Sequence, residues 1–231
     1  MTDITIDARD GGSFSAYVAR PSSASAPGLL VIQEIFGVNQ VMRDLCDGFA
    51  AQGYLAMCPD LFWRQEPGIR ITDKTKAEWA RAFELYKGFD ETKGVSDLIA
   101  SLEALRKLPG CNGRVGTIGF CLGGKLAYLM ATRSDADCNV SYYGVGIEAA
   151  LGEASAITRP YLAHVAAKDG FVPPAAQAQI TEALARIASA TLHVYADVDH
   201  AFARLGGEHY DAGAATLANQ RSAAFLKTNL G

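Results

Sequence analysis

The chain lacks a hydrophobic run long enough to cross a bilayer, and it lacks an excess of positive charge. Its 231 residues carry 21 Lys and Arg against 25 Asp and Glu, for a formal net charge of -4. This balance offers no basic footprint for nucleic acid or an anionic membrane. The first residues, Met1-Thr2-Asp3-Ile4, also lack the basic segment and apolar stretch of a signal peptide. These absences predict a cytoplasmic protein that binds neither membrane nor nucleic acid.

Cysteine is scarce, and no two cysteines have the Cys-x-x-Cys spacing of zinc sites and redox motifs. The five cysteines are scattered along the chain, at Cys46, Cys58, Cys111, Cys121 and Cys138. An odd number of scattered thiols argues against a disulfide framework and against a structural metal site. It also favours a reducing compartment.

Internal repeats, low-complexity segments and long linkers are absent as well, and a chain of 231 residues that is 49% hydrophobic can bury a large core. Apolar runs of strand length alternate with helical patterns. The strand-length runs are residues 14–18, 28–32, 54–58, 114–118, 140–143, 161–165 and 191–195; the helical patterns are residues 41–52, 76–88, 92–108, 125–130, 175–188 and 210–227. This alternation predicts one α/β domain over residues 1–231, with a mostly parallel central sheet and helices on both faces.

A glycine-rich turn, Gly-Phe-Cys-Leu-Gly-Gly at residues 119–124, joins one predicted strand to the helix after it. A strand, a Gly-x-Cys-x-Gly turn and a helix describe a nucleophile elbow with Cys121 in the place usually held by serine. Such a turn strains its central residue and sets the next amide at a helix N-terminus, where it can stabilise an oxyanion. A glycine-rich turn holding a buried structural cysteine is the alternative.

An acid and a histidine follow the elbow, each after a predicted strand. Asp169 follows the strand at 161–165 and His200 follows the strand at 191–195. In parallel sheets, ligands bind beyond the carboxyl ends of the strands. The order Cys121, Asp169, His200 is that of an α/β-hydrolase triad. An isolated Asp-Gly is typical of a turn, but the joint order favours catalysis.

Neighbouring residues compete for these roles. His164 and His193 fall inside predicted strands, where a core histidine with a satisfied hydrogen bond is expected. His209 opens the last predicted helix, well past the last strand. Asp197 and Asp199 lie beside His200, but a triad acid comes from another strand end, so both are interpreted as solvated loop residues.

Five segments resemble the dienelactone hydrolases (carboxymethylenebutenolidases), and the likeness covers nearly the whole chain. They read Gln-Glu-Ile-Phe-Gly-Val-Asn from residue 33, Cys-Pro-Asp-Leu from 58, the turn at 119–124, Tyr-Tyr-Gly from 142 and His-Ala-Phe-Ala-Arg from 200. The resemblance implies an α/β-hydrolase with Cys121 as nucleophile, His200 as histidine and Asp169 as acid, acting on an enol-lactone. It also implies a cytoplasmic monomer with no metal or cofactor, whose small-molecule lactone or ester substrate carries a carboxylate.

The resemblance also assigns Glu34 control over the ionisation of the thiol. Apolar neighbours such as Ile35 and Phe36 would desolvate its carboxylate and favour the neutral form. A carboxylate beside the sulfur would keep the resting Cys121 protonated until an anionic substrate shifts it to act as a base. The alternative role, a capping acid before a helix, is made redundant by Asn39.

The backbone amides of Ile35 and Leu122 are the expected oxyanion donors, and Phe36 is expected in the substrate pocket. The rest of the pocket departs from the family pattern, in which two arginines hold the substrate carboxylate. Arg204 matches one of them.

Ungapped alignment puts Trp79 in the place of the second arginine. Arg81 lies two residues later, nearly on the opposite helix face. Phe83 replaces a family tyrosine, and Ala201 replaces the serine after the histidine. These changes make the pocket less polar and favour apolar esters over dienelactone.

Two other protein classes share parts of the pattern. Class I amidotransferases use Gly-x-Cys-x-Gly but need a downstream His-x-Glu, and no histidine here precedes a glutamate by two. A non-catalytic flavodoxin-like or redox-sensing module with an exposed cysteine would have a similar sheet.

Overall fold

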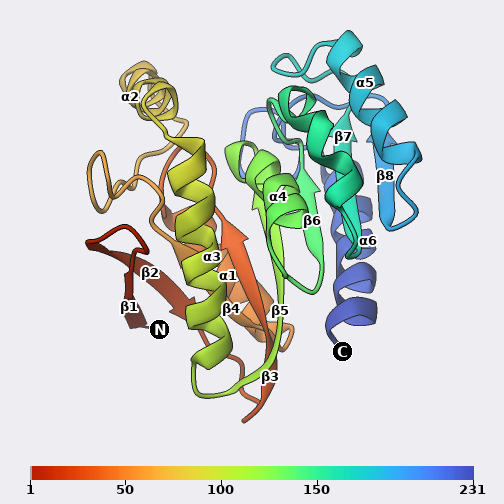
Figure 1. Ribbon diagram of the computed structural model, residues 1–231. Coiled ribbons are helices and arrows are strands. Elements are labelled where there is room, and N and C mark those ends of the chain that lie inside the picture. The colour runs from red at the N-terminus through yellow and green to blue at the C-terminus, as the bar shows by residue number, and fades with distance from the viewer. Residues whose placement is uncertain (1) are drawn as a thin grey trace. The chain divides into compact units, whose positions relative to one another are not determined.

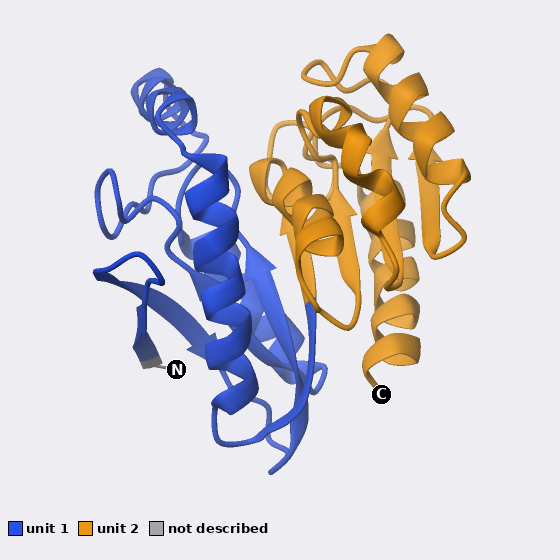
Figure 2. Ribbon diagram, in the orientation of Figure 1, with its two compact units in different colours: residues 1–116 blue, residues 117–231 orange. Residues whose placement is uncertain are grey.

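The computed structural model describes residues 2–231, and the chain divides into two compact units. The first unit ends at Gly116 and the second begins at Thr117, as the colours of Figure 2 show. The dividing point falls inside one strand, β5 (Cys111–Phe120). Each unit contains strands of a sheet together with the helices that cover them (Figure 1).

The strands of the first unit lie in the order β1-β2-β4-β3. They are β1 (Thr2–Asp7), β2 (Ser13–Ala19), β3 (Ala26–Ile32) and β4 (Leu55–Pro59). β2 pairs antiparallel with β1 and β4, whereas β3 and β4 are parallel. Every residue of β3 and β4 is buried, which explains why both strands read as continuous apolar runs.

Three helices belong to the first unit: α1 (Gln40–Ala51), α2 (Lys76–Lys87) and α3 (Glu91–Lys107). α1 and α3 lie against opposite faces of its strands (Figure 1). Each helix starts at a side chain that accepts a backbone N–H of the first turn: Asn39, Thr75 and Asp90.

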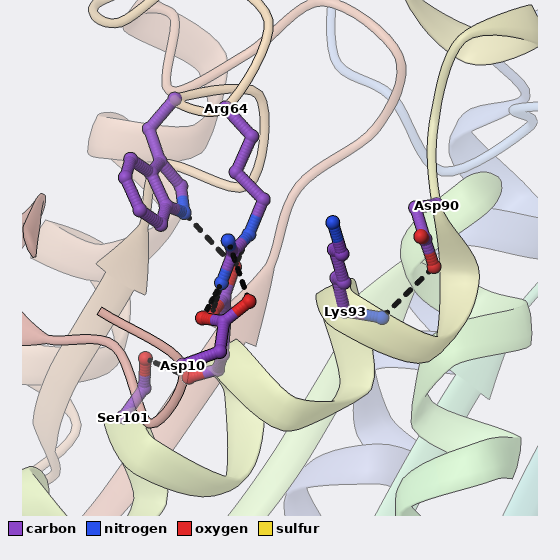
Figure 3. Close-up of polar contacts among 7 residues, drawn as sticks. Asp10, Arg64, Asp90, Lys93 and Ser101 are labelled. Carbon is purple, nitrogen blue, oxygen red and sulfur yellow. Dashed lines mark hydrogen bonds and ion pairs between the residues drawn. The ribbon is translucent and has the colours of Figure 1, made fainter. Parts of the chain in front are cut away.

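A buried carboxylate on α3 is held by the loop after β4. Asp97 is fully buried and accepts hydrogen bonds from Arg64 at 2.8 and 3.0 Å and from the Trp63 indole at 2.9 Å. Arg64 also pairs with Asp10 in the β1–β2 turn at 2.6 Å (Figure 3). Because an unpaired buried charge is costly, these bonds make Asp97 tolerable and connect three segments of the unit.

The strands of the second unit, β5, β6 (Asn139–Tyr142), β7 (Tyr161–Ala166) and β8 (Ala190–Tyr195), are parallel neighbours in chain order. Their carboxyl ends therefore share one edge. The helical segments are α4 (Leu122–Arg133), the 3-10 helix η1 (Ile147–Ala156), α5 (Pro174–Ala185) and α6 (Ala212–Leu230). α4 lies in front of β6 and α6 behind the strands (Figure 1).

The predicted mostly parallel sheet with helices on both faces is confirmed, while a single domain over residues 1–231 stays a prediction. The interpretation missed β1 and η1. β1 exposes alternate polar residues and buries little beyond Ile6, so its apolar signal is short. Within residues 2–231, no helix is both long and apolar enough to cross a membrane.

Candidate active site

Cys121 lies between β5 and α4 with a strained backbone, at φ 57° and ψ -115°. The glycines around it allow backbone segments to approach closely. A Cβ on Gly119 would lie 1.9 Å from the Gly123 carbonyl oxygen, and one on Gly124 would lie 2.4 Å from the Tyr142 carbonyl oxygen. That same Tyr142 oxygen accepts the Cys121 N–H at 3.1 Å. The turn therefore has the backbone shape of a nucleophile elbow.

Leu122 is the first residue of α4, directly after the cysteine. The first N–H groups of a helix have no intrahelical partner and lie at the positive end of its dipole. The Leu122 amide is thus placed where it can stabilise negative charge forming beside Cys121.

His200 contacts both of the other predicted triad members. Its Nδ1 lies 2.9 Å from Asp169 Oδ2, and its ring forms a hydrogen bond with the Cys121 side chain. The His200 and Asp169 side chains are only 5% and 1% exposed. The three residues come from the ends of three parallel strands of the second unit, so the structure brings them together as their order predicts.

The surroundings of His200 stabilise its charged form. Burial opposes the charge, but the interactions with the Cys121 side chain and the hydrogen bond to Asp169 outweigh it and raise the pKa of His200 to about 10. The rings of Tyr143 and Phe171 lie edge-on to the imidazole at 5.1 and 4.8 Å between centroids. An imidazolium held at neutral pH can stabilise an anion on sulfur.

The loop acids beside His200 differ from one another. Asp197 is 89% exposed and pairs with Lys168 at 3.1 Å, so it is a solvated residue as predicted. Asp199 is also partly solvated, with 39% of its side chain exposed, and in addition its Oδ1 accepts the N–H of His200 at 2.6 Å and that of Gly170 at 3.0 Å. The sequence did not indicate these two contacts of Asp199, because its partners are backbone amides that carry no sequence signal.

The remaining histidines have other environments. His164 is buried in β7 with both ring nitrogens bonded, to the Tyr195 hydroxyl at 2.8 Å and Ser222 Oγ at 2.9 Å, which confirms the core interpretation. His193 is only partly buried, so that interpretation was wrong for it. His209 lies in the turn before α6, with Nδ1 3.2 Å from the His200 carbonyl oxygen.

Arg204 and Ala201 lie in the turn that follows His200. Arg204 is buried, and its N–H donates to the Ala201 carbonyl at 2.9 Å. Ala201 is buried too and adopts a positive φ of 62°. Both residues are thus held close to His200 along the chain.

The aromatic residues predicted for the pocket form one row in the first unit. Trp79 packs edge-on against Phe36 at 5.1 Å and lies 5.5 Å from Phe83, both between ring centroids. The Trp79 indole N–H donates to the Asp73 carbonyl at 3.0 Å, which fixes the orientation of the ring. Phe83 is 44% exposed, so the row has an accessible end.

Arg81 points to two carboxylates instead. It pairs with Glu84 at 2.6 Å and also with Glu66. These partners raise the pKa of Arg81 and neutralise its charge locally. Its place on α2 matches the prediction that it cannot simply replace Trp79.

Glu34 and Ile35 follow β3 in the first unit, and both are buried. The preceding residue, Gln33, helps to hold this loop in place, because its Oε1 accepts the Leu61 N–H at 3.1 Å. Among residues 2–231, no group of three or more His, Cys, Asp or Glu side chains is arranged to hold a metal ion.

A profile described as the dienelactone hydrolase family matches residues 14–230. The chain belongs to the dienelactone hydrolase family. A provisionally named carboxymethylenebutenolidase from Azospirillum brasilense is 56% identical, with 100% of both chains covered. Carboxymethylenebutenolidase 1 from Cupriavidus pinatubonensis is 40% identical, covering 96% of this chain and 95% of that protein.

A solved structure supports the same assignment for the fold. A provisionally assigned dienelactone hydrolase from Klebsiella pneumoniae superposes with a TM-score of 0.85 at 29% identity, over 98% of this chain and 97% of that chain. The fold of this dienelactone hydrolase family member is of the α/β-hydrolase type, and the protein is a lactone or ester hydrolase. Neither an amidotransferase nor a non-catalytic module is favoured by these similarities.

Proposed function

We propose that this dienelactone hydrolase family member hydrolyses lactones or carboxylic esters through a thioester on Cys121. The observation that carries the proposal is the position of His200, bonded on one side to Asp169 and on the other to the cysteine side chain. A nucleophile, a histidine and an orienting acid in hydrogen-bond sequence constitute a catalytic triad.

The chemical steps follow from this geometry. The Cys121 thiolate attacks the carbonyl carbon, and the resulting oxyanion is stabilised by the amide of Leu122 and, by the family resemblance, of Ile35. The intermediate collapses by breaking the C–O bond, and the imidazolium of His200 gives its proton to the leaving oxygen. Neutral His200 then takes a proton from water, whose hydroxide attacks the thioester. Release of the acid leaves the thiolate and the imidazolium, and the thiolate regains from Glu34 the proton that it gave up when the substrate bound.

For Glu34 we propose the role that the family resemblance assigns, control over when the thiolate forms. The Glu34→Gln variant removes a negative charge while keeping the side-chain size. If Glu34 suppresses the thiolate, iodoacetamide should modify Cys121 faster in this variant, and the pH profile of turnover should change. An unchanged alkylation rate together with an unchanged profile would contradict the role.

For the substrate we propose an apolar or aromatic ester, or a lactone of that character. The aromatic row of Phe36, Trp79 and Phe83 offers apolar surface, and Arg81 is already paired with two carboxylates. By the family resemblance, Arg204 is the cation proposed to bind a substrate carboxylate. Monomeric state and cytoplasmic location stay predictions.

The proposed function is tested by kinetics of the Cys121→Ala variant on 4-nitrophenyl acetate and a small panel of lactones. Because triad members act as a unit, kcat should fall by roughly 10⁴-fold or more. Cys111→Ala is the matched control, since Cys111 is a partly exposed thiol at the start of β5. Near-normal turnover by Cys121→Ala, or an equal loss in Cys111→Ala, would overturn the proposal.

A further inference from the structure

The loops that carry Asp169 and His200 are also joined by a second acidic side chain, that of Asp199. Its Oδ1 accepts the His200 N–H at 2.6 Å from its own loop and the Gly170 N–H at 3.0 Å from the loop after β7. We call this group, Asp199 with the amides of Gly170 and His200, the Asp199 bridge. One oxygen atom thus binds the residue next to the triad acid and the triad histidine itself.

The Asp199 bridge and the triad contact join the same two loops, but their carboxylates come from opposite loops. In the triad, the Asp169 carboxylate reaches across to the histidine loop at His200 Nδ1. In the bridge, the Asp199 carboxylate reaches back to the acid loop at Gly170. These two contacts in opposite directions restrain the loops more than the triad contact alone, and they add to the backbone bond from the Lys168 N–H to the Val198 carbonyl at 3.0 Å.

The backbone around His200 needs such a restraint. The next residue, Ala201, has a φ of 62°, which a residue with a Cβ rarely adopts. The hydrogen bond of the His200 N–H is partly buried, and a buried N–H without an acceptor would cost free energy. Asp199 supplies that acceptor.

The charge of Asp199 also faces the imidazole. Burial disfavours the Asp199 carboxylate, but the amides of His200 and Gly170 and the nearby rings of His209 and His200 together lower its pKa. His209 Nδ1 lies 3.9 Å from Asp199 Oδ2. The acceptor on the bridge therefore stays ionised, as a strong acceptor of two N–H bonds.

We propose that Asp199 is a positioning residue of this hydrolase: it holds the Asp169 loop and the His200 loop in the register that the triad requires. The inference rests on the proposed function, since it presupposes that His200 acts on Cys121. Asp199 touches no reacting atom in this account and acts only through the backbone of its neighbours.

The experiment compares Asp199→Ala, which removes the acceptor, with Asp199→Asn, which keeps an oxygen for both N–H groups. Asp197→Ala is the matched control, because it removes an adjacent acid that is exposed and bonded only outward to Lys168. We measure kcat and KM on 4-nitrophenyl acetate, with thermal unfolding of each variant as a check of folding.

If the two loops are held less firmly in position, kcat should fall by about 10- to 100-fold in Asp199→Ala. KM should stay within about threefold of the wild type, because ester binding does not use the Asp199 bridge. Asp199→Asn should recover kcat to within about threefold of the wild type, and Asp197→Ala should match the wild type. If Asp199→Ala is folded and as active as Asp197→Ala, the inference is wrong. A tenfold or larger loss in Asp199→Asn also overturns it, whether or not Asp199→Ala folds.

Failure of this inference is distinguishable from failure of the proposed function. An inactive Cys121→Ala beside a fully active Asp199→Ala rejects only the Asp199 bridge. A fully active Cys121→Ala rejects the triad itself, and with it any positioning role for Asp199.

Discussion

At Cys121, different residues determine the position of the backbone and the surroundings of the side chain. The positive φ and the close backbone contacts at Gly119 and Gly124 determine where the sulfur lies. The side chain of Cys121 contacts His200, whose charged form is stabilised by Cys121 and Asp169. A substitution at one of these glycines should therefore displace the nucleophile, whereas a change at Asp169 should alter the protonation of His200 and leave the turn in place.

Trp79→Arg tests the substrate specificity at the residue scale. A second arginine would add one charge-assisted contact to a substrate carboxylate, worth roughly 1.5–3 kcal/mol, so kcat/KM for dienelactone should rise about tenfold or more. The same variant should lose activity on 4-nitrophenyl acetate, because the ring that packs edge-on against Phe36 is gone. Steady-state kinetics on both substrates measures the two changes.

Trp79→Phe is the control for the loss of the indole alone, since it keeps an aromatic ring without adding charge. A wild type that already prefers dienelactone strongly, with no gain in Trp79→Arg, would contradict the assignment. Arg81 would not explain that result easily, because Glu66 and Glu84 already bind its guanidinium.

Side-chain identity predicted that Cys121, Asp169 and His200 lie together, as the structure has them, but not the contacts that surround them. Cys121, Asp169 and His200 were recognisable because each follows a strand and their order is characteristic. Asp199 was not, since the amides it binds belong to every residue alike. The partial exposure of His193 was also missed: β8 has only one buried residue, Tyr195, so a strand position there does not imply the core.

At the scale of elements, a buried hydrogen-bond network joins β6, β7, β8 and α6. His164 bonds Tyr195 and Ser222, and Ser222 Oγ lies 2.7 Å from the Tyr142 hydroxyl. Burial, with smaller effects of His193 and Arg221, lowers the pKa of His164 from 6.5 to about 3. His164 is therefore neutral in the folded protein at any pH where the protein is used.

This network makes stability depend on pH. The pKa of His164 is lower in the folded state than in the unfolded state, so its contribution is present above pH 6.5 and is lost as the pH falls below it. Between pH 7 and pH 5 the contribution of His164 to the free energy of unfolding should fall by about 2 kcal/mol, because His164 binds a proton in the unfolded chain but not in the folded chain.

Urea unfolding at the two pH values measures this loss in the wild type and in His164→Gln. Glutamine can still bond to Tyr195 and Ser222 but does not titrate. The variant should therefore lose about 2 kcal/mol less than the wild type over the same interval, whatever its absolute stability. An identical loss in both proteins would mean that other groups cause the acid sensitivity.

Periodicity predicted most elements to within a few residues, and it failed where burial is one-sided or brief. β1 is an outer strand whose exposed side carries Asp3, Thr5 and Asp7, so only two isoleucines signal it. η1 is a 3-10 helix that begins at a left-handed Gly146. Short helices of that kind depend on local turn chemistry more than on an apolar repeat.

At the scale of the whole chain, the assignment rests on likeness along its full length. The family profile begins at residue 14 and ends at residue 230, and the relatives from Azospirillum brasilense and Cupriavidus pinatubonensis align over 100% and 96% of the chain. The residues expected from the family resemblance to differ from its pattern, Trp79, Phe83 and Ala201, are all predicted pocket residues. We therefore expect the protein to catalyse the same type of reaction as the family and to differ in its substrate preference.

The central claim is a covalent intermediate on Cys121, and mass spectrometry tests it most directly. The enzyme is mixed with 4-nitrophenyl acetate, quenched in acid within the first turnovers, digested and mapped. We expect one acetyl group, carried as a thioester on the peptide that contains Cys121, and none in Cys121→Ala. Acetyl groups on a different residue in a protein that turns over normally, or turnover by Cys121→Ala, would contradict it.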